Sequence, residues 1–159
     1  MIQAITESSF TAYINTEANR IDTSVNSSQI RYLVKFTNDL DGSVQYAYST
    51  IHLVYDRYTK LHFNYNATPD VYTGDTKLIP SGYYKYEVYE VSWTGAVAIS
   101  AGNAPVTEDD VLPIGSTHGV VQGLVAIGKL NMTDKAGTEQ VQYTQRTRPD
   151  TDNYIWYGQ

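Results

Sequence analysis

The feature that most constrains the fold is an alternation of apolar and polar residues with a period of two. From Ile30 to Thr37 every second residue is apolar, and Leu33 is an additional apolar residue in the otherwise polar set. After Asp41-Gly42 the alternation resumes with Val44, Tyr46 and Tyr48. Successive side chains of a strand point to opposite faces, so this pattern predicts strands. Because Asp-Gly favours a tight turn, the two runs predict a β-hairpin.

Strand signals recur along the rest of the chain, and no segment keeps a 3.6-residue period. The run 120–130 is apolar on both faces, which predicts a central strand, with Gly123 and Gly128 as bulge positions. The segment 66–74 is expected to be a loop. About eight to ten short strands with regular turn signals predict a single-domain, all-β sandwich, immunoglobulin-like or jelly-roll-like, over residues 1–159. The other expected strands are 2–5, 10–14, 61–65, 84–88, 97–100, 140–144 and 153–157.

The segment 78–93 carries a more specific signal. Pro80, Ser81 and Gly82 predict a tight turn, and Tyr84 follows Gly82 at the start of a strand. This spacing resembles the tyrosine corner of immunoglobulin-like sandwiches, in which the phenol bonds to backbone upstream. The expected core consists of Tyr32, Val34, Phe36, Leu61, Phe63, Tyr84, Tyr86 and Val88.

The first 29 residues leave two alternatives open. They contain the strand-like fragments 2–5 and 10–14, joined by polar connections. Polar segments bury too little apolar surface to fold alone, so residues 1–29 could instead form an extended arm that orders on docking.

Charge and composition exclude several functions. The net charge of −6, with only 18% charged residues, argues against nucleic acid or an anionic membrane as a partner. The absence of cysteine excludes disulfides, thiolate metal sites and a cysteine nucleophile. The longest apolar stretch, 119–128, is too short to span a bilayer.

No catalytic pattern occurs, so we expect a protein that is not an enzyme and uses no cofactor. His52, His62 and His118 are far apart in the sequence, and Ser116 lies near His118 without a nucleophile-elbow motif. Two acidic groups, Asp39/Asp41 and Glu108/Asp109/Asp110, have oxygen ligands suited to Ca²⁺. Turn formation explains Asp39/Asp41 more simply, and we expect no metal.

Three stretches together resemble small virion proteins of tailed bacteriophages that infect Bacteroidetes, including marine and crAss-like lineages. They are IRYLVKFTNDLDG (30–42), SGYYKYEVYEV (81–91) and the later motifs GVVQGLVAIGKL, EQVQYTQ and DNYIWYGQ (119–159). The resemblance covers residues 30–159. It implies a structural component of the virion, capsid-associated or at the head-tail connector, assembled in the host cytoplasm. Its partners would be other virion proteins and copies of itself, through sheet edges, the N-terminal segment and the aromatic residues near 153–159.

A binding module of another class is the alternative. The chain has 15 tyrosines, and tyrosine suits both half-buried sheet faces and contact surfaces. A carbohydrate- or receptor-binding β-sandwich would use exposed aromatic rings as stacking platforms. Its candidates in the sequence are Trp93, Trp156 and Tyr157.

Overall fold

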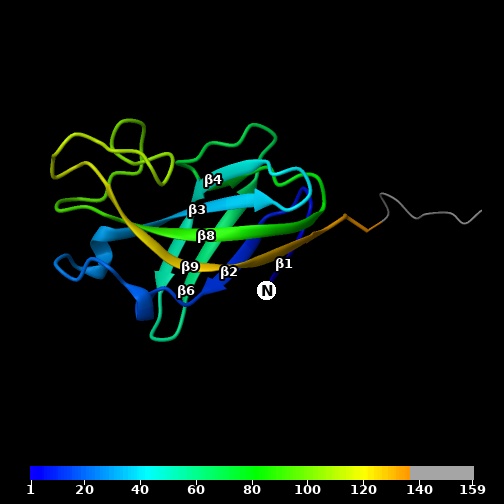
Figure 1. Cartoon of the computed structure of the whole chain (residues 1–159), viewed down its shortest axis with the longest axis horizontal. Coiled ribbons are helices and arrows are strands. Elements are labelled where there is room, and N and C mark those ends of the chain that lie inside the picture. Colours follow the sequence, from blue (N-terminus) through cyan, green and yellow to red (C-terminus); the bar gives the residue numbers. More distant parts are fainter. Residues whose placement is uncertain (137–159) are drawn as a thin grey trace, which may run out of the picture.

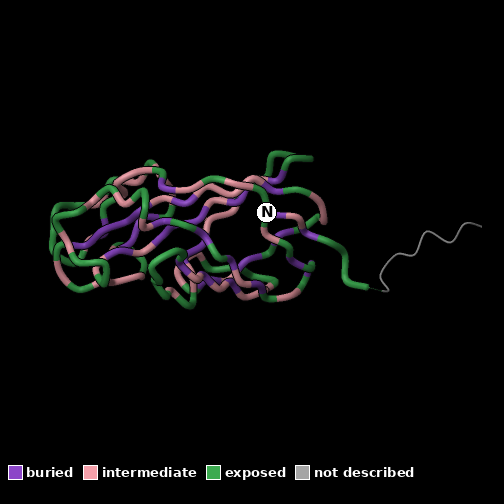
Figure 2. Tube along the Cα trace, turned by 90° about the horizontal axis from the view of Figure 1, so that it is seen from below, coloured by how far each residue is buried: buried purple, intermediate pink, exposed green. Residues whose placement is uncertain are grey.

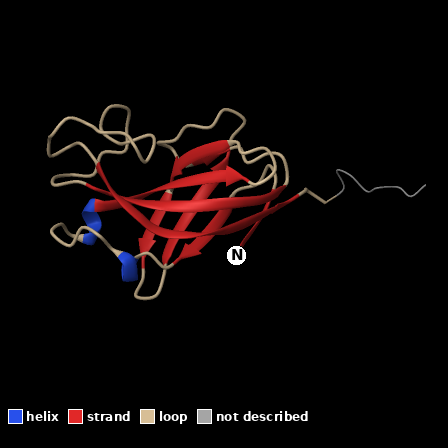
Figure 3. Ribbon diagram, viewed as in Figure 1, coloured by secondary structure: helices blue, strands red, loops and turns tan. Residues whose placement is uncertain are grey.

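The computed structural model describes residues 1–136, which form two β-sheets and two short 3-10 helices (Figure 3). The larger sheet has the strand order β1-β9-β8-β3-β4, and the smaller has β2-β6-β5, with the two-residue β7 beside β6. The bounds are β1 Ile2–Ile5, β2 Phe10–Ile14, η1 Glu17–Asn19, η2 Ser27–Gln29, β3 Ile30–Asn38, β4 Val44–Tyr48, β5 Ile51–Val54, β6 Thr59–Tyr65, β7 Asp75–Thr76, β8 Gly82–Ser92 and β9 Val120–Thr133.

The two sheets pack face to face, which confirms the predicted β-sandwich. In Figure 1, β3, β8 and β9 run across the view, and β2 and β6 cross them steeply. The orders β9-β8-β3-β4 and β2-β6-β5 are those of the two sheets of variable-type immunoglobulin-like domains. The first strand is added to the larger sheet by parallel pairing, with Ile2 opposite Leu130.

The predicted hairpin is present as β3 and β4. The strands pair antiparallel, and Gly42 adopts the positive φ of 71° that a side chain would disfavour. On its other side β3 pairs with β8 along its whole length, from Ile30 opposite Ser92 to Asn38 opposite Tyr84. On the face of β3 that points to the smaller sheet, every residue from Ile30 to Phe36 is a buried apolar residue, and the strand ends with the buried Asn38.

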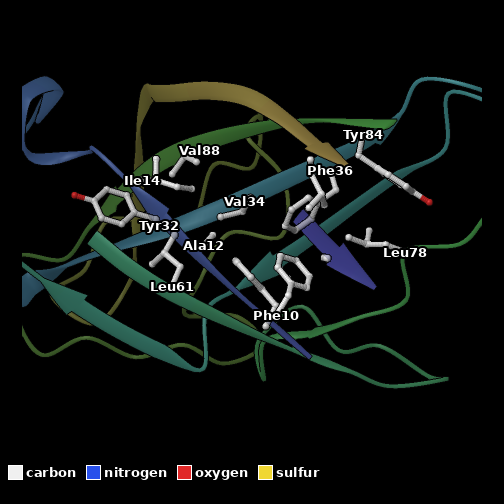
Figure 4. Close-up of a cluster of buried hydrophobic side chains, with 14 of the residues drawn as sticks. Phe10, Ala12, Ile14, Tyr32, Val34, Phe36, Leu61, Leu78, Tyr84 and Val88 are labelled. Atoms are coloured by element: carbon white, nitrogen blue, oxygen red, sulfur yellow. The ribbon is translucent and has the colours of Figure 1, made fainter. Parts of the chain in front are cut away.

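The main core lies between the sheets, as Figure 4 shows. Seven of the eight predicted core residues are buried there, and Tyr86 is partly buried against them. The rings of Phe10, Phe36 and Phe63 contact one another with centroids 5.3–6.1 Å apart. Figure 2 shows the same distribution along the chain, with buried stretches in the strands and exposed ones mainly in the connections.

The tyrosine corner is also confirmed. The Tyr84 hydroxyl donates a hydrogen bond to the Pro80 carbonyl oxygen at 2.7 Å. Burial raises the pKa of Tyr84, so the phenol remains a donor near neutral pH. The bond fixes the entry into β8 from the turn at residues 80–82.

A second, smaller cluster lies on the opposite face of the larger sheet, and it accounts for Leu33. Leu33 is fully buried against Tyr48, Val91, Trp93 and Ala104 beneath the β8–β9 loop, residues 93–119. The predicted strand at 97–100 is wrong, since these residues belong to that loop. Their apolar side chains Val97 and Ile99 pack against the cluster and do not form a ladder.

Residues 1–29 are part of the sandwich and are not an extended arm. They supply β1 to one sheet and β2 to the other, with Phe10, Ala12 and Ile14 in the core. The connection after β2 is held by the buried Glu90 carboxylate, which accepts hydrogen bonds from the backbone N–H groups of Ile21 (3.0 Å) and Asp22 (2.7 Å). These bonds satisfy backbone N–H groups in a polar segment that buries little apolar surface of its own.

Strand β9 contains the predicted strand at 120–130 and extends to Thr133. The prediction that 120–130 is a central strand is wrong for most of its length, because β8 pairs along one side but β1 pairs only with residues 130–133 on the other. A register shift next to Gly123, whose φ is 149°, confirms the first predicted bulge. Gly128 is not at a bulge; a Cβ there would lie 2.4 Å from the Tyr86 hydroxyl oxygen, so the glycine makes room for that ring. The expected strands at 140–144 and 153–157 lie outside the described residues.

Candidate interaction surfaces

The three histidines do not form a site. His52 packs beside the Tyr32 ring, and burial together with the nearby Arg31 charge lowers its pKa to about 4. His62 Nδ1 lies 2.9 Å from the Thr11 hydroxyl on the outer side of the smaller sheet. His118 lies in the β8–β9 loop, where its ring packs against Gly115. Each ring therefore has a different structural environment.

Side chains of both acidic groups are bonded to nearby backbone N–H groups or to side chains of other strands. Asp41 accepts a hydrogen bond from the Ser43 N–H (2.8 Å), and Asp39 forms an ion pair with Lys129. Asp110 accepts hydrogen bonds from the N–H groups of Val106 and Thr107. Within residues 1–136, no three His, Asp or Glu side chains are placed to hold a metal ion together.

The base of the β8–β9 loop is fixed to the outer face of the larger sheet. Glu108 accepts hydrogen bonds from Lys35 on β3 and Tyr46 on β4. Burial alone would raise the pKa of Glu108, but these two donors lower it below its ordinary value. Burial and the neighbouring carboxylate raise the pKa of Tyr46 to about 12. The carboxylate is therefore charged near neutral pH and holds the loop in place.

Further bonds hold the same loop at other points. The buried Tyr48 hydroxyl donates to the Pro105 carbonyl oxygen at 2.8 Å. The Gly119 N–H bonds to the Asn103 carbonyl oxygen (2.8 Å), and the Gly95 N–H bonds to that of Ser116 (2.9 Å). The loop therefore has a defined base, although it contains no strand or helix.

The tip of this loop, Val111–Ile114, is apolar, and all of its residues except the half-buried Leu112 are exposed. Val111 is 93% exposed and Ile114 is fully exposed. In Figure 1 the loop lies at the left end of the molecule, the end that also carries η1 and η2. Variable-type immunoglobulin domains carry their binding loops at one end of the sandwich, and one of these loops joins the same pair of strands. We call residues 111–114 the apolar tip.

A second exposed surface contains three tyrosines, which we call the tyrosine cluster. Tyr13 lies on β2, and Tyr55 and Tyr58 lie in the β5–β6 turn. Ring centroids are 5.4 Å apart for Tyr13–Tyr58 and 4.9 Å for Tyr55–Tyr58. A shallow depression beside them is lined by residues 54–58, including Asp56 and Arg57. Aromatic rings beside charged groups suit a ligand with both apolar and hydroxyl-bearing faces.

Of the aromatic residues proposed from the sequence, the structure describes Trp93 alone. Trp93 is fully buried in the second cluster and cannot stack on a ligand, so that candidate is wrong. Trp156 and Tyr157 lie outside the described residues. The sequence offered only a weak signal for the tyrosine cluster, namely two tyrosines spaced by a turn at 55–58.

A third surface is a groove along the outer edge of β9. Its walls are formed by residues 13–15 at the end of β2, Asn19, Arg20, Tyr86 and residues 124–127 of β9. The Arg20 guanidinium is occupied with the backbone, donating to the carbonyl oxygens of Asp22 and Val25. The groove therefore presents both polar groups and apolar side chains, the latter including Leu124 and Ile127.

Comparison with known proteins gives no match: no family model, no curated protein and no solved structure matches this chain. In residues 1–136, no helix has the length and apolar character needed to cross a membrane.

Proposed function

We propose that this protein is a non-enzymatic structural subunit of a tailed-phage virion, capsid-associated or at the head-tail connector. The observation that supports this role best is the apolar tip, in which Val111 and Ile114 are almost fully exposed on a loop with a fixed base. In this role the tip inserts into a pocket of a neighbouring virion protein.

Exposure of the apolar tip to water is unfavourable in free energy, and docking into a partner would remove that exposure. Removing apolar surface from water stabilises a complex by about 25 cal/mol per Å², so burying Val111 and Ile114 contributes on the order of 3 kcal/mol. A loop whose base is already held loses less conformational entropy on binding than a free loop. Exposed apolar groups rimmed by polar residues are typical of protein-protein contact sites.

The net charge of the domain also supports a role in contact with other proteins of a virion. A net charge of −6 repels packaged nucleic acid, so a subunit of this kind would contact proteins in a particle and not its genome. The sequence resemblance to virion proteins points in the same direction. The expected partners are neighbouring capsid or connector proteins and copies of this chain.

The test is mass spectrometry of purified particles from cells that make the chain. We expect wild-type protein in the particles, and at least tenfold less of the Val111→Ser/Ile114→Ser variant, with an unchanged melting temperature. Leu40→Ser is the matched control, because Leu40 is 80% exposed but lies in the β3–β4 turn at the other end of β3. Absence of the wild-type protein from particles would overturn the proposal.

A second candidate function is binding of a carbohydrate, supported by the tyrosine cluster. Tyr13, Tyr55 and Tyr58 are exposed, and sugar rings stack on such faces while their hydroxyls bond to nearby charged groups. Glycan-array binding that is lost in both Tyr55→Ala and Tyr58→Ala, and kept in Tyr83→Ala, would favour this function. Tyr83 is the control because it is exposed on the larger sheet.

A further inference from the structure

The outer edge of β9 is incompletely paired. On this side β1 covers only four residues, from Leu130 to Thr133. At the other end of the edge, the connection after β2 approaches, with Asn19 Nδ2 donating to the Val125 carbonyl oxygen at 3.0 Å. Between these two points, residues 126–129 have β8 on one side and no strand of the described chain on the other. The gap is about 13 Å long, at about 3.3 Å per residue.

The backbone groups in this gap point outward at alternate residues. The Thr133 carbonyl oxygen accepts a hydrogen bond from the Thr6 N–H, so the peptide groups of Thr133 face the β1 side. Backbone groups alternate sides along a strand, and those of Ile127 and Lys129 therefore face the same side. No strand of residues 1–136 pairs with these donors and acceptors, which an added strand could use.

The groove beside the gap sets the chemistry of the occupant. Tyr86 and Ile14 are core residues that reach the groove wall, and Leu124 and Ile127 are exposed apolar residues on β9. Its one cation, Arg20, is occupied with backbone carbonyls. A suitable occupant is a short, extended, uncharged segment rich in apolar and aromatic residues.

The chain itself contains a segment of this kind outside the described residues. Residues 153–157, Asn-Tyr-Ile-Trp-Tyr, are uncharged, and their length matches the gap. The residues between Ala136 and Asn153 can span about 50 Å when extended, which gives this segment a long reach. Strand β1, however, occupies the same edge between the gap and the end of β9. A strand returning within one chain would have to pass around β1.

We propose that the gap at residues 126–129 accepts residues 153–157 of a second copy of this chain as an added strand. Reciprocal exchange would close a two-fold dimer, in which main-chain hydrogen bonds supply affinity and the groove supplies side-chain register. The inference deepens the proposed assembly function and rests on it for its biological role. Strand exchange is tested with purified protein. Its result therefore does not depend on whether the protein is incorporated into particles, which tests the proposed function.

The chain has no cysteine, so introduced cysteines report unambiguously. Ile127→Cys protein is mixed with Ile155→Cys protein and, separately, with Trp156→Cys protein, under mild oxidation. Residues 155 and 156 would face opposite sides of an added strand, so one of the two should share the face of Ile127. We expect a disulfide-linked heterodimer in one of the two mixtures. Its yield should be at least tenfold above the yield obtained when Leu53→Cys protein replaces Ile127→Cys protein in the same mixture.

Leu53 is a fair control because it is exposed on β5, in the other sheet. We also expect the full chain to sediment as a dimer, and a chain lacking residues 153–159 to sediment as a monomer that still unfolds in one cooperative transition. A monomeric full chain, equal yields with Leu53→Cys, or disulfides that form only within a doubly substituted chain would each overturn the inference.

Discussion

The Tyr84 hydroxyl and the Pro80 carbonyl oxygen lie 2.7 Å apart, and this bond joins the start of β8 to the turn before it. Replacing Tyr84 with Phe keeps the buried ring and removes the donor. Loss of one such bond should lower the free energy of unfolding by about 1–2 kcal/mol. Urea denaturation measures the change. Tyr83→Phe, at an adjacent tyrosine that is 54% exposed, should leave the midpoint unchanged.

The second cluster beneath the β8–β9 loop can be tested through Leu33. Leu33→Ala removes a fully buried side chain and should cost about 2–5 kcal/mol. Leu53→Ala, at a position that is 45% exposed on β5, should change stability by less than about 0.5 kcal/mol. Equal melting temperatures for the two variants would mean that the loop does not cover Leu33 in solution.

Two glycines with similar backbone angles separate conformational strain from steric conflict. Gly42 and Gly74 have φ values of 71° and 78°, but only Gly74 is crowded. A Cβ at Gly74 would lie 2.6 Å from the Thr50 nitrogen and 2.8 Å from the Tyr48 carbonyl oxygen. Gly42→Ala should cost about 1 kcal/mol, and Gly74→Ala about 1–3 kcal/mol more. Chemical denaturation of both variants checks the difference.

His52 should make stability fall as the pH is lowered. Burial lowers its pKa from 6.5 to about 4 in the folded protein, so between these values the unfolded chain binds a proton that the folded chain does not. The free energy of unfolding should therefore fall by about 2–3 kcal/mol as the pH drops from 6.5 to 4, with no further contribution below that.

The contribution of His52 is isolated by comparison with His52→Phe, which keeps a ring beside Tyr32 and cannot titrate. The variant should show a shallower fall in stability over the same pH range, whereas Leu53→Ala should keep the wild-type profile. Parallel pH profiles for wild type and His52→Phe would contradict the prediction.

Local patterns predicted the strands that pair with sequence neighbours or carry strict alternation. The β3–β4 hairpin and β8 are examples, because their alternation and turn residues reflect the same contacts that bury them. The segment 97–100 misled the prediction because its apolar residues cover Leu33 and Trp93 from a loop. Residues 1–29 were ambiguous because their stability comes from long-range partners, among them Glu90 and β9.

The candidate surfaces were less predictable than the fold. Trp93 is of a residue type common at binding sites. It directly follows β8, however, and its ring is buried in the second cluster beneath the rest of the β8–β9 loop. The tyrosine cluster joins β2 to the β5–β6 turn, a proximity set by the β2–β6 register and visible only in three dimensions. The apolar tip was not predicted, because the exposure of Val111 and Ile114 depends on how the loop base is fixed in three dimensions.

The parallel pairing of β1 with β9 has a consequence for biosynthesis. Residues 2–5 leave the ribosome well before their partners, residues 130–133, which are made last among the described strands. At about 5–20 residues per second, the first strand waits roughly 6–26 s for its place in the sheet. During that interval its backbone is free to pair with another nascent chain on the same polysome. Order of synthesis would thus favour early encounters between copies of this protein.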